Sequence, residues 1–276
     1  MDQVTKDLCV KGYAVVPVFS KEKVQKAREL FFDWIERSPD VANHHLHSFQ
    51  GLMKFGEVGH QQHTWFVKTD PEVQRVFKHL WKTEELVTGF DGCCWIPEDW
   101  MCEDIVWTHT DQSAAAKGLH CIQGFVSLTH NVERSFVVYE GSHLLHEPYM
   151  RKRGFTGARH WRLIDPEYLD SIQSTRKVLE VQEGDLVLWD SRTFHQNQFG
   201  TRHEERLIQY VCYLPKHHPS NTLGMQRTRK KYYEKRRTTS HWPYPLIVNA
   251  AQPQDQILTV MPADLSEYEE EIQKLL

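Results

Sequence analysis

The spacing of hydrophobic positions changes along the chain, from helical repeats near the N-terminus to strand-like alternation further on. Residues Gly12 to Val18 alternate and are rich in β-branched side chains, which predicts a first strand. Ser20 is a suitable N-cap for a helix over Glu22 to Glu36, whose apolar residues share one face. Asp70-Pro71-Glu72 begins a second helix, because proline is tolerated in the first helical turn. From Leu86 to Tyr213, apolar runs separated by turn residues predict a β-rich core.

This order of elements is typical of a mainly β fold, the double-stranded β-helix. We expect a jelly-roll, cupin-like barrel with flanking N-terminal helices. The 276 residues then form a single domain, 1–276. Its buttress of helices and a strand covers 1–85 and its jelly-roll core covers 86–214, with a lid insertion at 144–177 and a C-terminal extension at 215–276. Residues Ser38 to Gly59 are expected to form a loop region near the mouth of the barrel.

Four dispersed residues carry the candidate chemistry. His109 and Asp111 are two apart, so their side chains share a face if the segment is extended. Residues Asp185 to Trp189, His195 to Phe199 and Arg206 to Tyr213 predict three further strands. If the last two form a hairpin at Gly200-Thr201, His195 and Arg206 lie opposite each other, with Cβ atoms roughly 5 Å apart.

These residue types suit a particular metal site. Two histidines and one carboxylate are the ligand set of a mononuclear non-haem iron(II) centre, which keeps open positions for a co-substrate and oxygen. The guanidinium of Arg206 is a fork suited to bidentate capture of a carboxylate. We therefore expect His109, Asp111 and His195 to be metal ligands and catalytic residues, and Arg206 to bind the co-substrate.

With these residues, the chain resembles the phytanoyl-CoA dioxygenase-like family of iron(II)- and 2-oxoglutarate-dependent oxygenases. The matching stretches are Lys11 to Pro17, His109 to Gln112, Gly118 to Leu128, Glu140-Gly-Ser-His143, Gly184 to His195, and Arg206 eleven residues after His195. One departure is Glu140, where many relatives carry proline. The resemblance implies Fe(II) and O₂ as cofactor and oxidant and 2-oxoglutarate as co-substrate. It implies hydroxylation of a C–H bond in a small organic substrate, with release of succinate and CO₂.

Each of these residues also has a simpler interpretation. The chain has 17 histidines, so a histidine two residues before an aspartate occurs readily by chance. His195 could be a buried core histidine, and Arg206 could pair with Glu204 or Glu205 at the surface. As a whole, the protein could be a non-catalytic jelly-roll protein that binds a structural metal, such as zinc, or another ligand. The joint occurrence of all four residues favours the iron site. Of the rival ligands His120, His130, His143 and His146, only His143 stays a weak candidate.

Polar residues on the buried strands predict a second layer of the site. In residues Leu119 to Leu128, the period of two places Gln123 and Ser127 on one face, and Asn197 follows His195 on its face. Buried polar groups need partners. We expect Gln123, Asn197 and Ser127 to contact bound 2-oxoglutarate; the alternative is that they bond to one another or to the backbone.

Two charged segments have open interpretations. The insertion Leu144 to Lys177 carries Arg151, Arg159, His160 and Trp161 among others, and loops of this length often act as lids. It would then favour a substrate with an anionic group, unless it is only a solvated loop. The basic run after Ser220 predicts a helix, with Met225 and Tyr232 packing on the barrel. The alternative is a nucleic-acid patch, in which case the enzyme would be an oxygenase acting on nucleic acid.

The bulk properties favour a cytoplasmic enzyme of small molecules. The net charge of −4 provides no global attraction to nucleic acid or to an anionic membrane. No apolar run approaches the roughly 20 residues of a membrane span, and the N-terminus lacks a signal-peptide core. The cysteines show no metal or disulfide spacing and predict reduced thiols: Cys9, Cys93, Cys94, Cys102, Cys121 and Cys212. No sequence feature indicates an oligomeric state.

Overall fold

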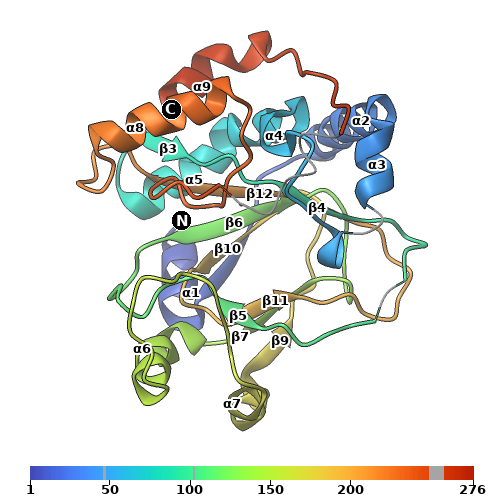
Figure 1. Cartoon of the computed structure of the whole chain (residues 1–276). Coiled ribbons are helices and arrows are strands. Elements are labelled where there is room, and N and C mark those ends of the chain that lie inside the picture. The colour runs from blue at the N-terminus through green and yellow to red at the C-terminus, as the bar shows by residue number, and fades with distance from the viewer. Residues whose placement is uncertain (46–47, 102, 249–257) are drawn as a thin grey trace.

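The fold consists of two antiparallel sheets with helices packed mostly on the larger one (Figure 1). The computed structural model describes residues 1–45, 48–101, 103–248 and 258–276. The larger sheet has the order β1-β10-β6-β12-β4-β2, with β3 also paired to β12, and the smaller has the order β8-β5-β11-β7-β9. The strands are β1 Tyr13–Pro17, β2 Leu52–Met53, β3 Leu86–Thr88, β4 Cys93–Ile96, β5 His109–Thr110, β6 Ile122–Ser127, β7 Phe136–Tyr139, β8 Arg162–Leu163, β9 Arg176–Val178, β10 Asp185–Asp190, β11 His195–Asn197 and β12 Arg206–Pro215.

Three helices, α2, α5 and α8, begin at a residue whose side chain caps the first turn. Ser20 accepts a hydrogen bond from the Lys23 amide at the start of α2, and Asp70 accepts two backbone amides at the start of α5. These two helices confirm the N-terminal predictions. The helices are α1 Asp2–Lys11, α2 Lys21–Arg37, α3 Pro39–His45, α4 Gln62–Lys68, α5 Pro71–Trp81, α6 Ser142–Lys152, α7 Pro166–Ser171, α8 Leu223–Glu234 and α9 Glu269–Leu275, with short 3₁₀ turns at Phe49–Gly51, Val58–His60, Gln173–Thr175 and Ser266–Tyr268.

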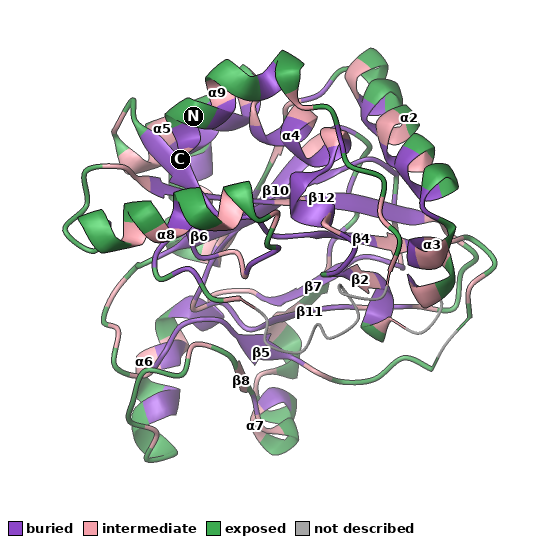
Figure 2. Ribbon diagram, turned by 45° about the horizontal axis from the view of Figure 1, so that its top comes forward, coloured by how far each residue is buried: buried purple, intermediate pink, exposed green. Residues whose placement is uncertain are grey.

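The strands of the larger sheet separate two cores, and Figure 2 shows its central strands β10, β6 and β12 mostly buried. In β12, Leu207, Val211 and Tyr213 pack with the helical layer, whereas Ile208 and Tyr210 pack between the two sheets. The same alternation places Gln123 and Phe125 of β6 on the inter-sheet side. Side chains on this side can reach the space between the sheets, where the candidate site lies.

The predicted hairpin between β11 and β12 is wrong. β11 pairs with β5 and β7 in the smaller sheet, whereas β12 pairs with β3, β4 and β6 in the larger one. The connection between them crosses from one sheet to the other and is held by carboxylates. Asp104 accepts the amides of Phe199 and Gly200, and Glu204 accepts three amides from residues 132–134. Gly200-Thr201 therefore lies in a crossover.

Two further expectations need correction. Residues Ser38 to Gly59 contain α3, β2 and short 3₁₀ turns instead of one loop, with residues 46 and 47 outside the described part, but Leu52 to Lys54 do line the cavity described below. The insertion Leu144 to Lys177 contains most of α6, all of β8 and α7, and part of β9, because its apolar residues, such as Tyr149 and Leu169, form a small core together with Tyr139 and Phe194. β1 and β2, which belong to the proposed buttress, are strands of the larger sheet.

The described cysteines, Cys9, Cys93, Cys94, Cys121 and Cys212, are all free thiols, as expected, and Cys102 lies outside the described residues. Among the described residues, none of the helices has the length and apolarity that a membrane span requires.

Candidate metal centre and adjoining cavity

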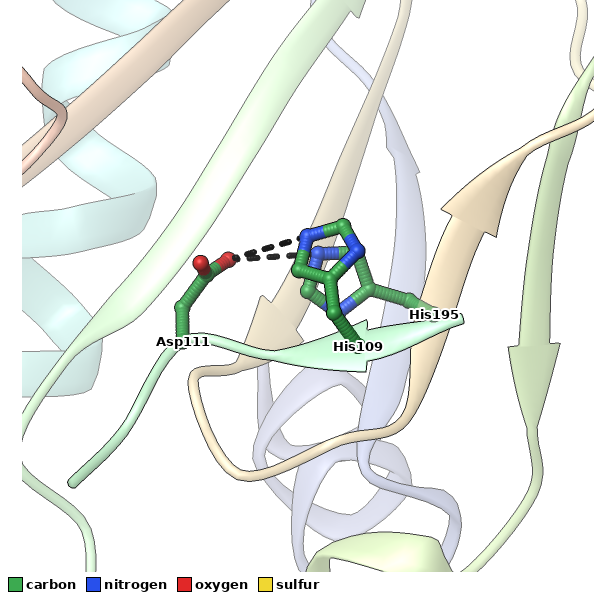
Figure 3. A group of neighbouring side chains, drawn as sticks. All are labelled: His109, Asp111 and His195. Carbon is green, nitrogen blue, oxygen red and sulfur yellow. Dashed lines mark ion pairs between the residues drawn. The ribbon is translucent and has the colours of Figure 1, made fainter. Parts of the chain in front are cut away.

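The two histidines of the predicted site face each other across a pair of short strands. β5 and β11 are antiparallel, and His109 is the direct partner of His195 in their register. Directly opposed residues have their Cβ atoms close together on one face of a sheet. Asp111 follows β5, and its side chain turns to the same point, as Figure 3 shows. Its Oδ2 lies 3.7 Å from His109 Nε2 and 3.3 Å from His195 Nε2.

Backbone carbonyls fix which nitrogen of each ring is free. His109 Nδ1 lies 3.1 Å from the Trp107 carbonyl oxygen, and His195 Nδ1 lies 2.9 Å from that of Thr193. A carbonyl can only accept, so each Nδ1 carries the proton and each Nε2 presents a lone pair toward Asp111. Burial lowers the pKa of His109 to about 3, which keeps this ring neutral at neutral pH. The tautomers are those that metal ligation requires.

Asp111 is held as a carboxylate. Burial raises the pKa of Asp111, but the positive charges that His109 and His195 carry whenever they are protonated outweigh burial and hold the pKa of Asp111 below its usual value. Gln123 donates from Nε2 to Asp111 Oδ2 at 3.0 Å, and the Asp111 amide donates to the Ser191 carbonyl. Three ligand atoms, one from each residue, lie within 4.8 Å of one another. This donor set fits a divalent transition metal.

Arg206 is buried and does not lie opposite His195. It pairs in register with Ile96 of β4, and its side chain extends on the inter-sheet face beside Phe125, 5.5 Å from the ring centroid. Nη1 contacts the Cys94 sulfur at 3.2 Å, whereas Nη2 is buried without a hydrogen-bond partner among the described residues. A buried cationic donor without an acceptor is costly.

The surface ion pair considered for Arg206 is not formed, because Glu205 pairs with Arg28 and Glu204 accepts backbone amides.

The three polar residues of the predicted second layer have different surroundings. Gln123 contacts Asp111, as described above, and Asn197 donates to the Tyr210 hydroxyl at 3.1 Å; both line the cavity. Ser127 donates to the Thr129 carbonyl at 2.8 Å and is not among the described residues that line the cavity. The alternative of a backbone partner therefore holds for Ser127.

A cavity of about 580 Å³ opens beside the three candidate ligands. Its inner wall consists of the ligands and of aromatic residues packed around them: Trp107 stacks on His109 with ring centroids 4.8 Å apart, and Trp189 and Phe136 contact His195. Its outer wall comes from three segments distant in sequence, Leu52 to Lys54, Ala158 to Trp161 and Thr239 to Trp242. The volume is in the ordinary range for small-molecule sites.

The sequence prediction missed His241 and Trp242 in this wall, whereas it placed the segment that contains Lys54 near the mouth of the barrel without naming Lys54. His241 and Trp242 lie in an irregular segment without hydrophobic periodicity, so no pattern places them near His109. The one available signal was the aromatic and histidine content of Ser240 to Tyr244, which is unusual for a polar C-terminal extension.

The remaining candidates lie away from the centre. His143 Nε2 bonds to the Cys9 carbonyl and His146 Nε2 to the Gln112 carbonyl, while His120 and His130 contact Lys117 and Glu180. Within the insertion, Arg159, His160 and Trp161 line the cavity, whereas Arg151 is exposed on α6 and does not. The basic helix predicted after Ser220 is α8, and none of its residues lines the cavity.

Comparison with known proteins identifies the fold. No family model matches the chain. HygX from Streptomyces hygroscopicus, solved with nickel and 2-oxoglutarate, superposes with a TM-score of 0.55 at 15% identity over 79% of this chain and 88% of its own. The non-haem α-ketoglutarate-dependent carbocyclase SnoK of nogalamycin biosynthesis has a TM-score of 0.53 at 16% identity, covering 78% and 84%. EctD from S. alaskensis, solved with bound Fe, has a TM-score of 0.55 at 14% identity, covering 78% and 76%.

These likenesses define the class of fold: the chain has the fold of the non-haem iron and 2-oxoglutarate oxygenases. In sequence, it is 30% identical over 230 residues to Ava biosynthesis cluster protein O of Aspergillus versicolor, a match that covers 78% of this chain and 74% of that protein. The chain belongs to the same family as this Aspergillus protein.

Proposed function

We propose that the protein is a non-haem iron(II)- and 2-oxoglutarate-dependent dioxygenase of the phytanoyl-CoA dioxygenase-like branch, which hydroxylates a C–H bond of a small organic substrate. The observation that carries the proposal is the convergence of two histidine Nε2 atoms on Asp111 beside a cavity. We further propose that the two sheets close as a jelly-roll barrel within one oxygenase domain.

The residues of the site could bind both the iron and the 2-oxoglutarate. His109, Asp111 and His195 would hold the iron. Arg206 would hold the far carboxylate of 2-oxoglutarate, which supplies the acceptor that its buried Nη2 lacks. When bound, iron and 2-oxoglutarate activate O₂: one oxygen atom enters succinate as CO₂ leaves, and the other enters the substrate as hydroxyl.

The side chains of the protein prepare this chemistry in specific ways. The carbonyls of Trp107 and Thr193 hold each Nε2 lone pair toward the metal position, and Gln123 orients the Asp111 carboxylate. Trp107, Trp189 and Phe136 pack around the ligand rings and limit water access on that side. Asn197 and Tyr210, which bond to each other on the cavity wall, are further candidate contacts for the co-substrate.

Hydroxylation is the outcome that the ligand set favours. Related halogenases lack the ligand carboxylate and bind chloride in its place, whereas this chain has Asp111. Two proteins of similar structure have other activities: SnoK is a carbocyclase and SnoN is an epimerase. The same three ligands can serve those outcomes, and the substrate pose in the cavity selects among them.

Two alternatives predict different behaviour. A jelly-roll protein with only a structural metal has no need of Arg206, whose orphaned buried donor instead favours a co-substrate. An oxygenase of nucleic acid would use the basic α8, but Arg229 of this helix is buried in bonds to Asn221 and Pro243, and the helix lies outside the cavity. Salt-dependent retention on immobilised DNA or RNA would favour that second alternative.

The test is turnover of the co-substrate. Wild-type protein supplied with Fe(II), 2-oxoglutarate and O₂ should form succinate even without a prime substrate, as slow uncoupled turnover. Asp111→Ala should form none above the protein-free background. Equal succinate in both proteins, or none in either while iron is bound, would reject the proposal.

A further inference from the structure

The outer wall of the cavity differs from the inner wall in charge. Lys54 and Arg159 line it, both are exposed, and neither forms an ion pair with any residue in the described ranges. The carboxylates that line the cavity are already engaged: Asp91 pairs with buried Lys68, and Asp111 is held by the two histidines and Gln123. The open charge facing the cavity is therefore positive.

The same wall carries flat apolar surface. Trp161 is 39% exposed although it lies at the cavity, and its ring is 5.5 Å from that of His109. The guanidinium of Arg159 lies 5.9 Å from the Trp161 centroid, which places a cation at the edge of this aromatic surface. A flat ring packed on Trp161 would lie next to the ligand residue His109 and within reach of Arg159.

Two buried nitrogen atoms that lack hydrogen-bond partners among the described residues complete the wall. The ring of His160 packs on that of Trp242 with centroids 4.6 Å apart, so the insertion and the C-terminal segment meet at this point. Trp242 Nε1 and His241 Nε2 are buried without a hydrogen-bond partner in the described part of the chain. An indole N–H can only donate, so its natural partner is an oxygen acceptor.

We propose that this outer wall, with Trp161, Lys54 and Arg159 as its specificity residues, selects a flat aromatic or fused-ring substrate that carries an anionic oxygen group. The proposal rests on the proposed function for the chemistry, but the binding preference can be measured without iron. The ring packs against Trp161, and the anionic group pairs with Lys54 and Arg159. An aliphatic chain leaves Trp161 without a stacking partner. A neutral ring leaves Arg159 without an ion-pair partner, and leaves Lys54 with only the longer-range attraction of Asp111.

Calorimetric titration of the metal-free full chain with three probes tests this preference. Naphthalene carboxylate should bind about tenfold more tightly than naphthalene carboxamide, since a charge-assisted contact is worth roughly one decade in affinity. It should also bind more tightly than octanoate, which carries the same charge without the ring. Equal affinity for the three probes, or no binding of any, would overturn the proposal.

Substitutions in the outer wall test whether its residues cause the preference for the aromatic carboxylate. Lys54→Met and Arg159→Gln should each weaken the carboxylate probe but leave the carboxamide unchanged, and Trp161→Ala should weaken both naphthalene probes. Arg151→Gln is the matched control, because this arginine belongs to the same insertion but does not line the cavity. If Arg151→Gln weakens the carboxylate as much as Arg159→Gln does, the effect is general electrostatics and the proposal fails.

Competition separates this site from the co-substrate site. Excess 2-oxoglutarate should not displace naphthalene carboxylate; displacement that Lys54→Met abolishes would assign Lys54 to 2-oxoglutarate and overturn the proposal. Failure of the oxygenase function is distinguishable, because it would appear as absent succinate formation in wild type while the probe preference stays measurable.

Discussion

The inner and outer walls of the cavity are built by different means. The inner wall is set by strand register: His109 and His195 are direct cross-strand partners, and their tautomers are fixed by their own backbone carbonyls. The outer wall is assembled from three irregular segments that meet through side-chain contacts, such as His160 on Trp242. Strand register fixes the relative positions of the candidate ligands. The loop segments of the outer wall can instead change in sequence, and so alter which substrate fits, without disturbing the sheets.

The largest effect should come from the ligands themselves. His195→Ala or Asp111→Ala should abolish iron binding and turnover, because the remaining two residues cannot hold the metal in a defined geometry. Calorimetric iron titration under argon measures this. Wild-type iron affinity in either variant would break the assignment of the inner wall.

Arg206→Ala should retain iron and lose 2-oxoglutarate. Loss of one partner of a buried charged pair costs on the order of 2 to 5 kcal/mol, equivalent to about 30-fold to several thousand-fold in affinity. Titration of the iron-loaded variant measures the loss, and thermal unfolding checks that the fold persists. Arg206→Lys should have an intermediate affinity, because it keeps the charge but loses the fork. Unchanged affinity for 2-oxoglutarate in Arg206→Ala would remove the anchor assignment.

Gln123→Leu should weaken iron binding by about 10- to 100-fold, as other substitutions of residues that orient metal ligands do. The expected loss arises because Gln123 donates a hydrogen bond to Asp111 Oδ2 and so orients this candidate ligand. Ser127→Ala is the control on the same strand face, because the Ser127 hydroxyl bonds to a backbone carbonyl instead. Equal effects of the two substitutions would show that iron binding responds to any polar loss in β6.

The smallest expected effect concerns histidines that pack instead of binding metal. His63 lies buried between Phe31 and Trp34, and burial lowers its pKa to about 3. The unfolded chain takes up a proton on this residue below its ordinary pKa of about 6.5, while the native protein does not, so stability falls as the pH drops from there toward 3. At pH 5 the loss from His63 should be about 2 kcal/mol.

Comparison of urea unfolding at neutral pH and at about pH 5 measures this loss. His63→Phe keeps the aromatic packing and removes the proton site, so it should unfold with a smaller pH dependence than wild type. An identical pH dependence in the two proteins would show that His63 is not buried in its neutral form.

The sequence grouped His109, Asp111 and His195 as one candidate site, because each residue type has few chemical roles and their joint spacing is restrictive, and the structure places the three together. It predicted α2 and α5 from caps and periodicity. The place of Arg206 was predicted wrongly, since a hairpin at Gly200 is locally plausible, and only the partners of β12 in the larger sheet decide against it. His241 and Trp242 could not be assigned to the cavity, because contacts between distant loops leave no local pattern.

The most direct test is anaerobic titration of the protein with iron(II) and then with 2-oxoglutarate, observed in the visible region. The account predicts a weak metal-to-ligand charge-transfer band that appears with 2-oxoglutarate in wild type and is absent in His195→Ala. If wild-type protein binds iron but develops no band, the protein does not use 2-oxoglutarate at this centre and the proposed oxygenase function is wrong.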